Sequence, residues 1–391
     1  MEKGEIFMRK RIAVAILVVL FLPFLNVGVA AAQLDIEARS AILMDAASGK
    51  ILFEKNAHEK WYPASMTKIM TLTLALEAVE EGKVSLQDMV IASEHASSYG
   101  GSQVWLEPGE EFTLEKMLIG IAVGSANDCS VAVAEYIAGS EEAFVEMMNQ
   151  RARELGAQNT HFANSHGLHD ENHYTTAYDM AQIARHALTL PKLRELAAMK
   201  SYQFRGDPKP LVLWNYNKLL WWYPGADGIK TGYTSKARYN LTATAERDGL
   251  RLIAVVMGVD KRNGHFAEAM KLFNYGFARY GFKKFYEAGE LVTSLPVSKG
   301  SQDTLDLLAK DKIGVIMPKG KDEGLNLKLE VPSMVNAPVA EGQQVGEAVI
   351  MQENKELARF PLVAAQAVER ATFWRQTGKV FSQVLTIGDK R

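Results

Sequence analysis

The segment 229–259, IKTGYTSKARYNLTATAERDGLRLIAVVMGV, predicts three consecutive β-strands. They are Ile229–Tyr233, Tyr239–Arg247 and Leu250–Val259, and they are rich in the β-branched and aromatic residues that favour strands. Asp248-Gly249, between the last two, is the strongest short-range signal for a hairpin. We therefore expect antiparallel pairing in this part of the chain.

Elements on both sides of this segment extend the pattern. Residues 40–45 and 50–54, separated by a turn that contains Gly49, predict a second hairpin. Strands at both ends with helices between them indicate an α+β domain. The helices are expected to end where a glycine can adopt the left-handed cap conformation, and they cover 113–123, 127–137 and 141–155, with a further helix at 265–280.

Composition limits the class of protein. The chain has 391 residues, 48% hydrophobic and 23% charged, which excludes collagen and low-complexity chains. One hydrophobic core usually supports about 250–300 residues, so we expect two domains. The single cysteine, Cys129, excludes an internal disulfide and a Cys-rich metal site. A net charge of −2 gives little support for nucleic-acid binding.

The N-terminus has the pattern of a secretory signal. Arg9-Lys10-Arg11 precede an apolar run, Ile12–Leu25, which leads to the small residues Ala30-Ala31-Ala32. We expect cleavage near Ala32; the alternative is an uncleaved membrane anchor over Ile12–Ala32. Either way the mature chain is expected outside the cytoplasm.

The C-terminal third has a different character. From residue 285 short apolar stretches alternate with Gly, Pro, Lys and Asp, which predicts a small β-rich domain. The stretches include 292–297, 312–317, 325–331 and 346–351. Residues 368–391 place apolar and aromatic side chains on one helical side, so we expect an amphipathic helix in the membrane interface. The alternative is that this segment packs on the β-rich domain.

The first of three short motifs is Ser65-Met66-Thr67-Lys68, at the start of a predicted buried helix over 66–81. Residues three apart on a helix share a face, so the Ser65 hydroxyl and the Lys68 amine would be neighbours. Lysine can act as the base for a serine nucleophile once burial and nearby positive charge lower its pKa. About one S-x-x-K is expected by chance, so this motif alone is weak.

The second motif, Ser125-Ala126-Asn127, lies in the junction between two predicted helices. The serine hydroxyl could relay a proton, and the asparagine amide could hold a substrate peptide group through its donor and acceptor. The alternative is that Ser125 or Asn127 merely caps the following helix.

The third motif, Lys230-Thr231-Gly232, lies on a predicted strand. Its lysine and hydroxyl could bind a carboxylate, and Gly232 would let a substrate backbone approach closely. The alternative is an ordinary edge-strand lysine. Each motif occurs once, in this order, on a helix start, a helix junction and a strand, and this joint occurrence favours a single site.

On these motifs the sequence resembles the serine penicillin-recognising enzymes, whose signature is S-x-x-K, S-x-N and K-T-G. It is most similar to the low-molecular-mass penicillin-binding proteins that act as D-alanyl-D-alanine carboxypeptidases, serine peptidase family S11. The resemblance covers about 34–280 and continues into the β-rich region and the tail. The matching stretches are 62–68, 125–128, 159–162, 166–168, 223–225 and 227–232.

The resemblance implies a penicillin-recognising serine transpeptidase/β-lactamase-like domain: an antiparallel sheet with helices on both faces, plus a helical subdomain. A small all-β domain and a C-terminal amphipathic helix would follow. The implied boundaries are 1–32 for the signal peptide, 33–284 for the catalytic domain, 285–367 for the β-rich domain and 368–391 for the helix.

The resemblance also implies roles for individual residues. The oxyanion would lie between the backbone N–H groups of Ser65 and Tyr233. The enzyme would remove the terminal D-alanine from the peptidoglycan pentapeptide stem at the outer face of the cytoplasmic membrane. Penicillin and other β-lactams would acylate the same serine, and no cofactor or metal is expected. Ser65 would be the nucleophile, Lys68 its base, Ser125 and Lys230 the proton relay, Asn127 the group that aligns the substrate, and Thr231 with Lys230 and Gly232 the binding site for its carboxylate end.

One departure from the family pattern concerns substrate fit. After the third motif the family commonly has a small glycine-containing stretch, whereas this chain has Ala237-Arg238-Tyr239-Asn240.

Three other functions compete with this interpretation. His161, His166, His169 and His173 lie close together in the sequence and could suggest zinc, but no H-E-x-x-H helix is present. A serine β-lactamase would share the three motifs, yet no E-x-x-L-N stretch lies between the second and the third. A non-catalytic cell-wall-binding or regulatory module would be expected to lose the nucleophile or its base.

Overall fold

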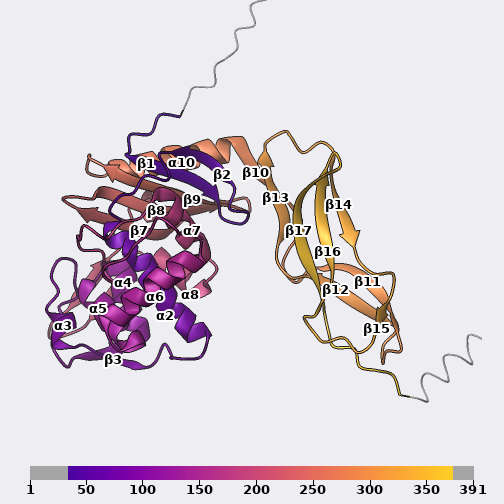
Figure 1. Ribbon diagram of the computed structural model, residues 1–391, viewed down its shortest axis with the longest axis horizontal. Helices are drawn as coiled ribbons and strands as arrows, with labels where there is room; N and C mark the ends of the chain where they lie inside the picture. Colours follow the sequence, from indigo (N-terminus) through magenta and orange to yellow (C-terminus); the bar gives the residue numbers. More distant parts are fainter. Residues whose placement is uncertain (1–33, 373–391) are drawn as a thin grey trace, which may run out of the picture. The chain divides into compact units, whose positions relative to one another are not determined.

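The computed structural model describes residues 34–372 (Figure 1). Its N-terminal part contains a five-stranded antiparallel sheet in the order β2-β1-β9-β8-β7. The two predicted hairpins are confirmed, and Asp248 and Gly249 both have positive φ, +49° and +78°, as a type I′ turn requires. The five strands are β1 (Ser40–Asp45), β2 (Ile51–Lys55), β7 (Ala226–Thr234), β8 (Arg238–Arg247) and β9 (Leu250–Val259).

The sheet joins residues that are far apart in the sequence. Strand β1 pairs with β9, and Ile42 lies opposite Val255. Every residue of β1 is buried, so this strand lies inside the sheet and not at its edge. The strand that carries Lys230, β7, is an edge strand.

The predicted helices are present, with small shifts at their ends. A short 3-10 turn, η2, precedes the first of them, and α5 ends at Gly139 in the left-handed conformation, as expected. At the end of α4 the left-handed residue is Ser125, with a φ of +58°, so the glycine prediction was wrong there. The elements are η2 (Ala64–Thr67), α2 (Lys68–Glu80), α4 (Leu114–Gly124), α5 (Asn127–Ala138), α6 (Glu141–Glu154) and α10 (Gly264–Arg279).

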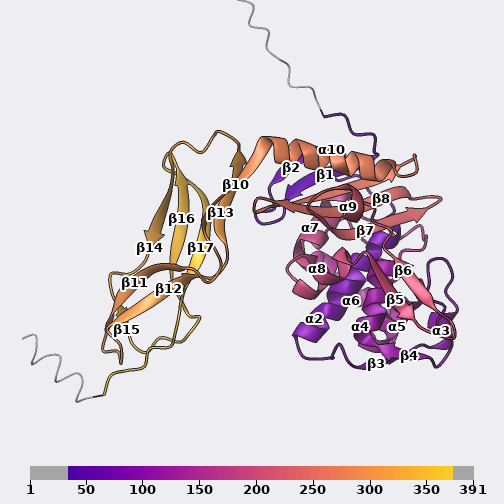
Figure 2. The same cartoon turned by 180° about the vertical axis from the view of Figure 1, so that it is seen from behind.

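Helices cover both faces of the sheet, which confirms the α+β architecture. Helix α10 lies along one face, and α7 (Ala177–Ala187) and α8 (Pro191–Ala198) lie on the other (Figures 1 and 2). On that second side α2, α4, α5 and α6 form a helical cluster, with α2 buried on nearly every face as predicted. The apolar core of this part extends from the sheet into the cluster.

Several short elements had no counterpart in the sequence analysis. A hairpin of β5 (Ser201–Arg205) and β6 (Leu211–Trp214) follows α8. The others are α3 (Glu94–Ser97), β3 (Met89–Ile91), β4 (Glu111–Thr113) and α9 (Leu219–Trp222).

The C-terminal part is all β. A six-stranded sheet has the order β14-β16-β17-β12-β11-β15, and a separate pair joins β10 to β13. Leu305, Leu307 and Leu362 belong to its apolar core. The predicted stretches correspond to β11 (Leu291–Ser298), β13 (Ile313–Pro318), β14 (Leu325–Glu330) and β16 (Gln344–Gln352), and the unpredicted strands are β10 (Tyr280–Tyr286), β12 (Thr304–Ala309), β15 (Val335–Asn336) and β17 (Lys355–Ala364).

The C-terminal helix cannot begin at residue 368 as predicted. Val368 forms a β-bridge with Val339, and Arg370 forms one with Gly300, so this backbone is extended. The remainder of the predicted helix, 373–391, and the predicted signal peptide, 1–32, lie outside the described residues. Within 34–372 there is no helix of the length and hydropathy that a membrane crossing needs.

Candidate active site

The first motif forms a tight turn that brings its two functional side chains together. Ser65 lies in η2, and α2 begins at Lys68, whose Nζ donates a hydrogen bond to Ser65 Oγ over 3.3 Å. This contact confirms the prediction, made from the three-residue spacing, that the Ser65 hydroxyl and the Lys68 amine are neighbours. Ala64 has a φ of +49°, and Gly167 lies against its carbonyl, where a Cβ on residue 167 would be 2.0 Å from the oxygen.

Lys68 is held as a buried amine with defined partners. Its Nζ also donates to Asn127 Oδ1 over 2.7 Å and to the His166 carbonyl over 2.5 Å. Burial, followed by the charge of Lys230, holds the pKa of Lys68 well below its usual value. A lysine with a lowered pKa can be neutral and accept the proton of a neighbouring hydroxyl.

The second motif occupies the junction between α4 and α5. Ser125 is the left-handed residue that ends α4, and α5 is preceded by Ala126 with no side-chain cap hydrogen bond. The alternative that Ser125 caps the following helix is therefore wrong. Asn127 is buried, its Nδ2 donates to the Gly100 carbonyl over 2.8 Å, and its Oδ1 accepts from Lys68. These two contacts leave one hydrogen on Nδ2 and one lone pair on Oδ1 unused.

The residue after the second motif fixes the loop that faces it. The Asp128 carboxylate accepts hydrogen bonds from the backbone N–H groups of Val104 and Leu106. Burial raises the pKa of Asp128, and these N–H groups act in the opposite direction. The loop over 100–106 is thereby tied to the start of α5.

Cys129 follows on α5 and lies behind the site. It is free and fully buried. It packs against Gly120 of α4, where a Cβ on residue 120 would be 2.8 Å from its Sγ. Burial raises the pKa of the thiol well above its usual value, so Cys129 acts here as a packing residue.

The third motif lies on β7, at the edge of the sheet. Lys230 is nevertheless buried, with 3% of its surface exposed, so it is not an ordinary edge-strand lysine. Burial lowers its pKa to about 7, and its Nζ donates to the Thr231 carbonyl over 3.2 Å. Its positive charge is close enough to lower the pKa of Lys68, which brings the first and third motifs together.

Gly232 allows the turn that carries Ser65, η2 with the preceding Pro63, to lie directly on β7. We call this segment the nucleophile turn. A Cβ at this position would be 2.5 Å from the Pro63 carbonyl oxygen and 3.2 Å from the Met66 nitrogen. The close approach therefore involves the protein backbone, whereas the motif alone indicated a substrate. Asn240 on β8 adds a hydrogen bond of 2.9 Å from its Nδ2 to the Tyr62 carbonyl, which further fixes the turn.

The three motifs open into one cavity of about 330 Å³. Ser65, Ser125 and Thr231 line it, together with Gly232 and Tyr233. Asn127, Lys68 and Lys230 lie buried behind this lining. The cavity thus brings together the hydroxyls of Ser65, Ser125 and Thr231, with two buried amines behind them.

Two histidines support the site without lining it. His173 Nδ1 accepts from the Ala163 N–H, so its Nε2 carries the hydrogen and donates to Thr67 Oγ1 over 2.7 Å. Burial lowers the pKa of His173 to about 3 and that of His166 to about 2. Both are therefore neutral at pH 7. Within residues 34–372 no group of three His, Cys, Asp or Glu side chains is arranged to hold a metal ion.

Sequence reasoning missed several of these supports. The His166 carbonyl, the His173 imidazole and the Asn240 amide all contact segments about 100 residues away or more. The stretch 166–168 was identified only through the family resemblance. The contact that it makes uses the backbone carbonyl of His166, and the sequence pattern cannot predict such a contact because every residue has a carbonyl.

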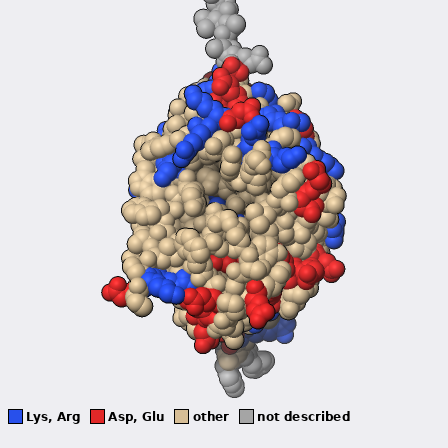
Figure 3. Space-filling model, turned by 90° about the vertical axis from the view of Figure 1, so that its left-hand side faces the viewer, with Lys and Arg blue, Asp and Glu red and all other residues tan. Residues whose placement is uncertain are grey.

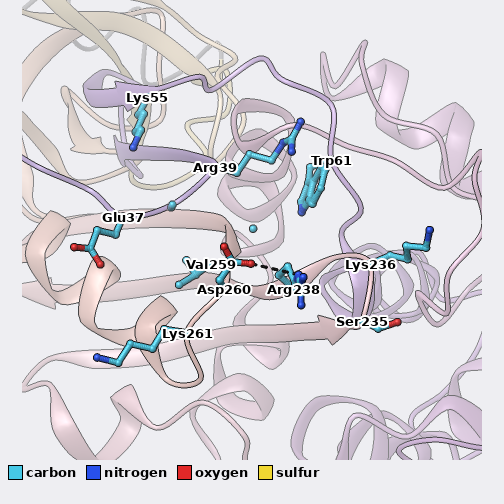
Figure 4. A pocket seen from close by; sticks show the side chains of 12 residues that line it. Glu37, Arg39, Lys55, Trp61, Ser235, Lys236, Arg238, Val259, Asp260 and Lys261 are labelled. Atoms are coloured by element: carbon cyan, nitrogen blue, oxygen red, sulfur yellow. Dashed lines mark ion pairs between the residues drawn. The ribbon is translucent and has the colours of Figure 1, made fainter.

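A second hollow is lined by the turn between β7 and β8 and by the end of β9 (Figure 4). Basic side chains dominate its lining, but several have acceptors within the protein. Arg238 pairs with Asp260 at 3.3 Å, and Arg39 pairs with Glu59 at 2.5 Å. Its serine, Ser235, and the neighbouring Lys236 are both exposed, whereas Ser65 contacts a buried amine, so we place the chemistry in the first cavity.

A serine in contact with a buried lysine, on an α+β fold that also carries S-x-N and K-T-G, defines the penicillin-recognising serine enzymes as the class. Residues 27–261 match the family model Peptidase_S11, D-alanyl-D-alanine carboxypeptidase, and residues 280–370 match that of the penicillin-binding protein 5 C-terminal domain. The chain belongs to the D-alanyl-D-alanine carboxypeptidase family, Peptidase_S11.

Individual relatives are similar over most of their length. D-alanyl-D-alanine carboxypeptidase DacF of Bacillus subtilis is 41% identical over 348 residues, 88% of this chain and 90% of that protein. DacC of Escherichia coli is 33% identical over 360 residues, 90% of this chain and 88% of that protein. The structure of penicillin binding protein 5 from Haemophilus influenzae has a TM-score of 0.68 at 35% identity, covering 86% of this chain and 98% of that one.

Proposed function

We propose that this chain removes the terminal D-alanine from the pentapeptide stem of peptidoglycan through an acyl-enzyme on Ser65. Serine acyl-enzyme chemistry is general in the family to which it belongs. The observation that carries the assignment to Ser65 is its contact with the buried Lys68 amine. Both the nucleophile and its base are present, so a purely non-catalytic module is disfavoured.

Acylation begins with a proton transfer inside this pair. Neutral Lys68 takes the Ser65 proton as Oγ attacks the carbonyl carbon of the penultimate D-alanine. The oxyanion accepts hydrogen bonds from the backbone N–H groups of Ser65 and Tyr233. The C–N bond then breaks, and the leaving amine of D-alanine receives a proton that Ser125 and Lys230 relay from Lys68.

Deacylation reverses these roles with water as the nucleophile. A base of the site, Lys68 in its neutral form, takes a proton from water as the water oxygen attacks the ester carbonyl. The ester C–O bond breaks, Ser65 Oγ regains its proton, and the shortened stem leaves. Asn127 aligns the peptide in both steps through the hydrogen and lone pair that Lys68 and Gly100 leave unused.

The substrate carboxylate binds at the third motif. Thr231 lines the cavity, and buried Lys230 lies next to it in the sequence. A carboxylate favours the charged form of a nearby lysine, so binding of the substrate raises the pKa of Lys230 from about 7.

The assignment is tested by the intact mass after exposure to penicillin. We expect a stable adduct on the unmodified protein, none on Ser65→Ala, and slow adduct formation on Lys68→Arg. Absence of an adduct on the folded, unmodified protein contradicts the proposal. Incubation with a pentapeptide separates the remaining functions: free D-alanine supports the carboxypeptidase, and rapid turnover of penicillin without D-alanine release supports a β-lactamase.

We further propose that the protein acts at the outer face of the cytoplasmic membrane, with 1–32 as a secretory signal and the C-terminal tail as a membrane contact. The β-rich part would then position the catalytic part. Val368 is fully buried, so removal of the tail should begin at residue 373 to spare the β-bridges. We expect this truncation to release signal-cleaved protein from membranes with its peptide activity intact; retention on the membrane contradicts the tail as anchor.

A further inference from the structure

Exposed aromatic side chains are concentrated near the cavity. Within the described range 34–372 six aromatic side chains are exposed, and four of these lie within residues 214–222. Exposed apolar surface that gathers in one place usually marks a binding surface. The four are Trp214, Tyr216, Trp221 and Trp222, and the other two are Trp105 and Tyr233.

The segment 212–218 alternates regularly between exposed and buried side chains. Val212, Trp214 and Tyr216 are 44%, 61% and 52% exposed, whereas Leu213 and the asparagines at 215 and 217 are buried. Val212 and Trp214 lie on strand β6, where alternate side chains share a side, and Tyr216 continues the alternation of exposure two residues beyond the strand. We call Trp214 and Tyr216 the aromatic row.

Inward side chains fix the backbone of this row. Leu213 packs against Gly124, the last residue of α4, where a Cβ would be 3.1 Å from Leu213 Cδ2. The Asn215 Nδ2 donates to the Met199 carbonyl over 2.9 Å, and the Asn217 Nδ2 donates to the Gly228 carbonyl over 2.8 Å. The backbone that carries the rings is therefore fixed. A ligand that binds to them immobilises few additional rotatable bonds, so little conformational entropy is lost.

The row leads into the catalytic cavity. Tyr216 lines the cavity with Ser65 and Ser125, and so does Lys218, the next outward residue. The face drawn in Figure 3 is hollowed in its middle, and few charged side chains surround the hollow. Lys218 and Arg262 also line the cavity, so a ligand that continues along this segment meets aromatic rings beside cationic side chains.

We propose that the aromatic row is a subsite for the glycan chain that carries the stem peptide. The inference rests on the proposed function, because the stem of peptidoglycan is attached to a glycan. The C–H groups on the face of a sugar ring match the electron-rich face of Trp214 and Tyr216, while the sugar hydroxyls at the ring edge stay in water. The row thus distinguishes a stem on its glycan from a free peptide.

The test compares two substrates that differ in the glycan alone: a free pentapeptide and the same pentapeptide on its disaccharide. We expect kcat/KM to be higher for the glycan-borne substrate, and Trp214→Ala to lower the ratio of the two values about three- to tenfold. Trp214→Phe, which keeps a ring, should retain most of the ratio. Met334→Ala is the matched control, because it removes a 54% exposed apolar side chain in the C-terminal β part and should leave the ratio unchanged.

Each failure has a distinct signature. A ratio near one in the unmodified protein, or a ratio that Trp214→Ala does not change, overturns the glycan subsite and leaves the proposed function intact. Loss of binding to phospholipid vesicles by Trp214→Ala at an unchanged ratio makes the row a membrane contact and likewise overturns the subsite. Hydrolysis of neither substrate overturns the proposed function itself.

Discussion

Replacing Gly232 by alanine would force the nucleophile turn away from β7. The new Cβ would be 2.5 Å from the Pro63 carbonyl oxygen, and an ordinary contact needs about 3.5 Å, so the two segments must separate by about 1 Å. This shift would displace Ser65, the proposed nucleophile, which follows Pro63 by two residues. A displacement of this size in an active site costs about 10²-fold in rate, and overpacking costs about 1–3 kcal/mol of unfolding free energy.

The assay is the second-order rate constant for penicillin acylation, followed by intact mass, together with the unfolding free energy in urea. Gly206→Ala is the matched control, because a Cβ at that glycine meets no atom within 4 Å. We expect acylation of Gly232→Ala to slow about 100-fold and that of Gly206→Ala to stay unchanged. An acylation rate for Gly232→Ala within twofold of the unmodified protein would refute the argument that this contact positions the nucleophile.

Three further predictions concern buried titratable groups. The kcat/KM for peptide hydrolysis should fall as the pH rises through about 7, because Lys230 loses the charge that binds the carboxylate; Lys230→Arg should abolish that decrease, and its persistence would assign it to another group. The pKa of His173 is about 3 in the folded chain against 6.5 as its usual value, so the unfolded state binds more protons between these values. The unfolding free energy should therefore decrease as the pH drops from about 6.5 towards 3, and urea unfolding of His173→Gln should show a smaller decrease; an equal decrease would contradict this assignment. Asp128→Asn should cost about 2 kcal/mol in urea unfolding at pH 7, because an amide is a poorer acceptor for the Val104 and Leu106 N–H groups; an unchanged stability would show that these bonds contribute little.

Local patterns in the sequence were sufficient to predict much of the fold and the three motifs. The contact between Ser65 and Lys68 follows from a three-residue spacing, and the hairpin at Asp248-Gly249 follows from turn chemistry. Such features depend on neighbouring residues, so one sequence is enough to indicate them.

Contacts between distant segments could not be predicted in this way. The His166 carbonyl is 98 residues from the lysine that it contacts, and no side-chain type identifies it. The left-handed Ser125 replaces the expected glycine because the helix junction fixes its conformation, although most side chains disfavour it. The hairpin β5–β6 was missed for a related reason: its inward residues become buried only against α4.

The buried Cys129 makes the helix junction observable in solution. Its thiol is the single one in the chain, and it packs between α4 and α5 next to the second motif. A thiol reagent can reach it only when these helices separate, so the rate of labelling in native conditions measures the free energy of that local opening. The chain therefore carries an internal reporter for the rigidity of Ser125 and Asn127, and its readout requires neither substrate nor antibiotic.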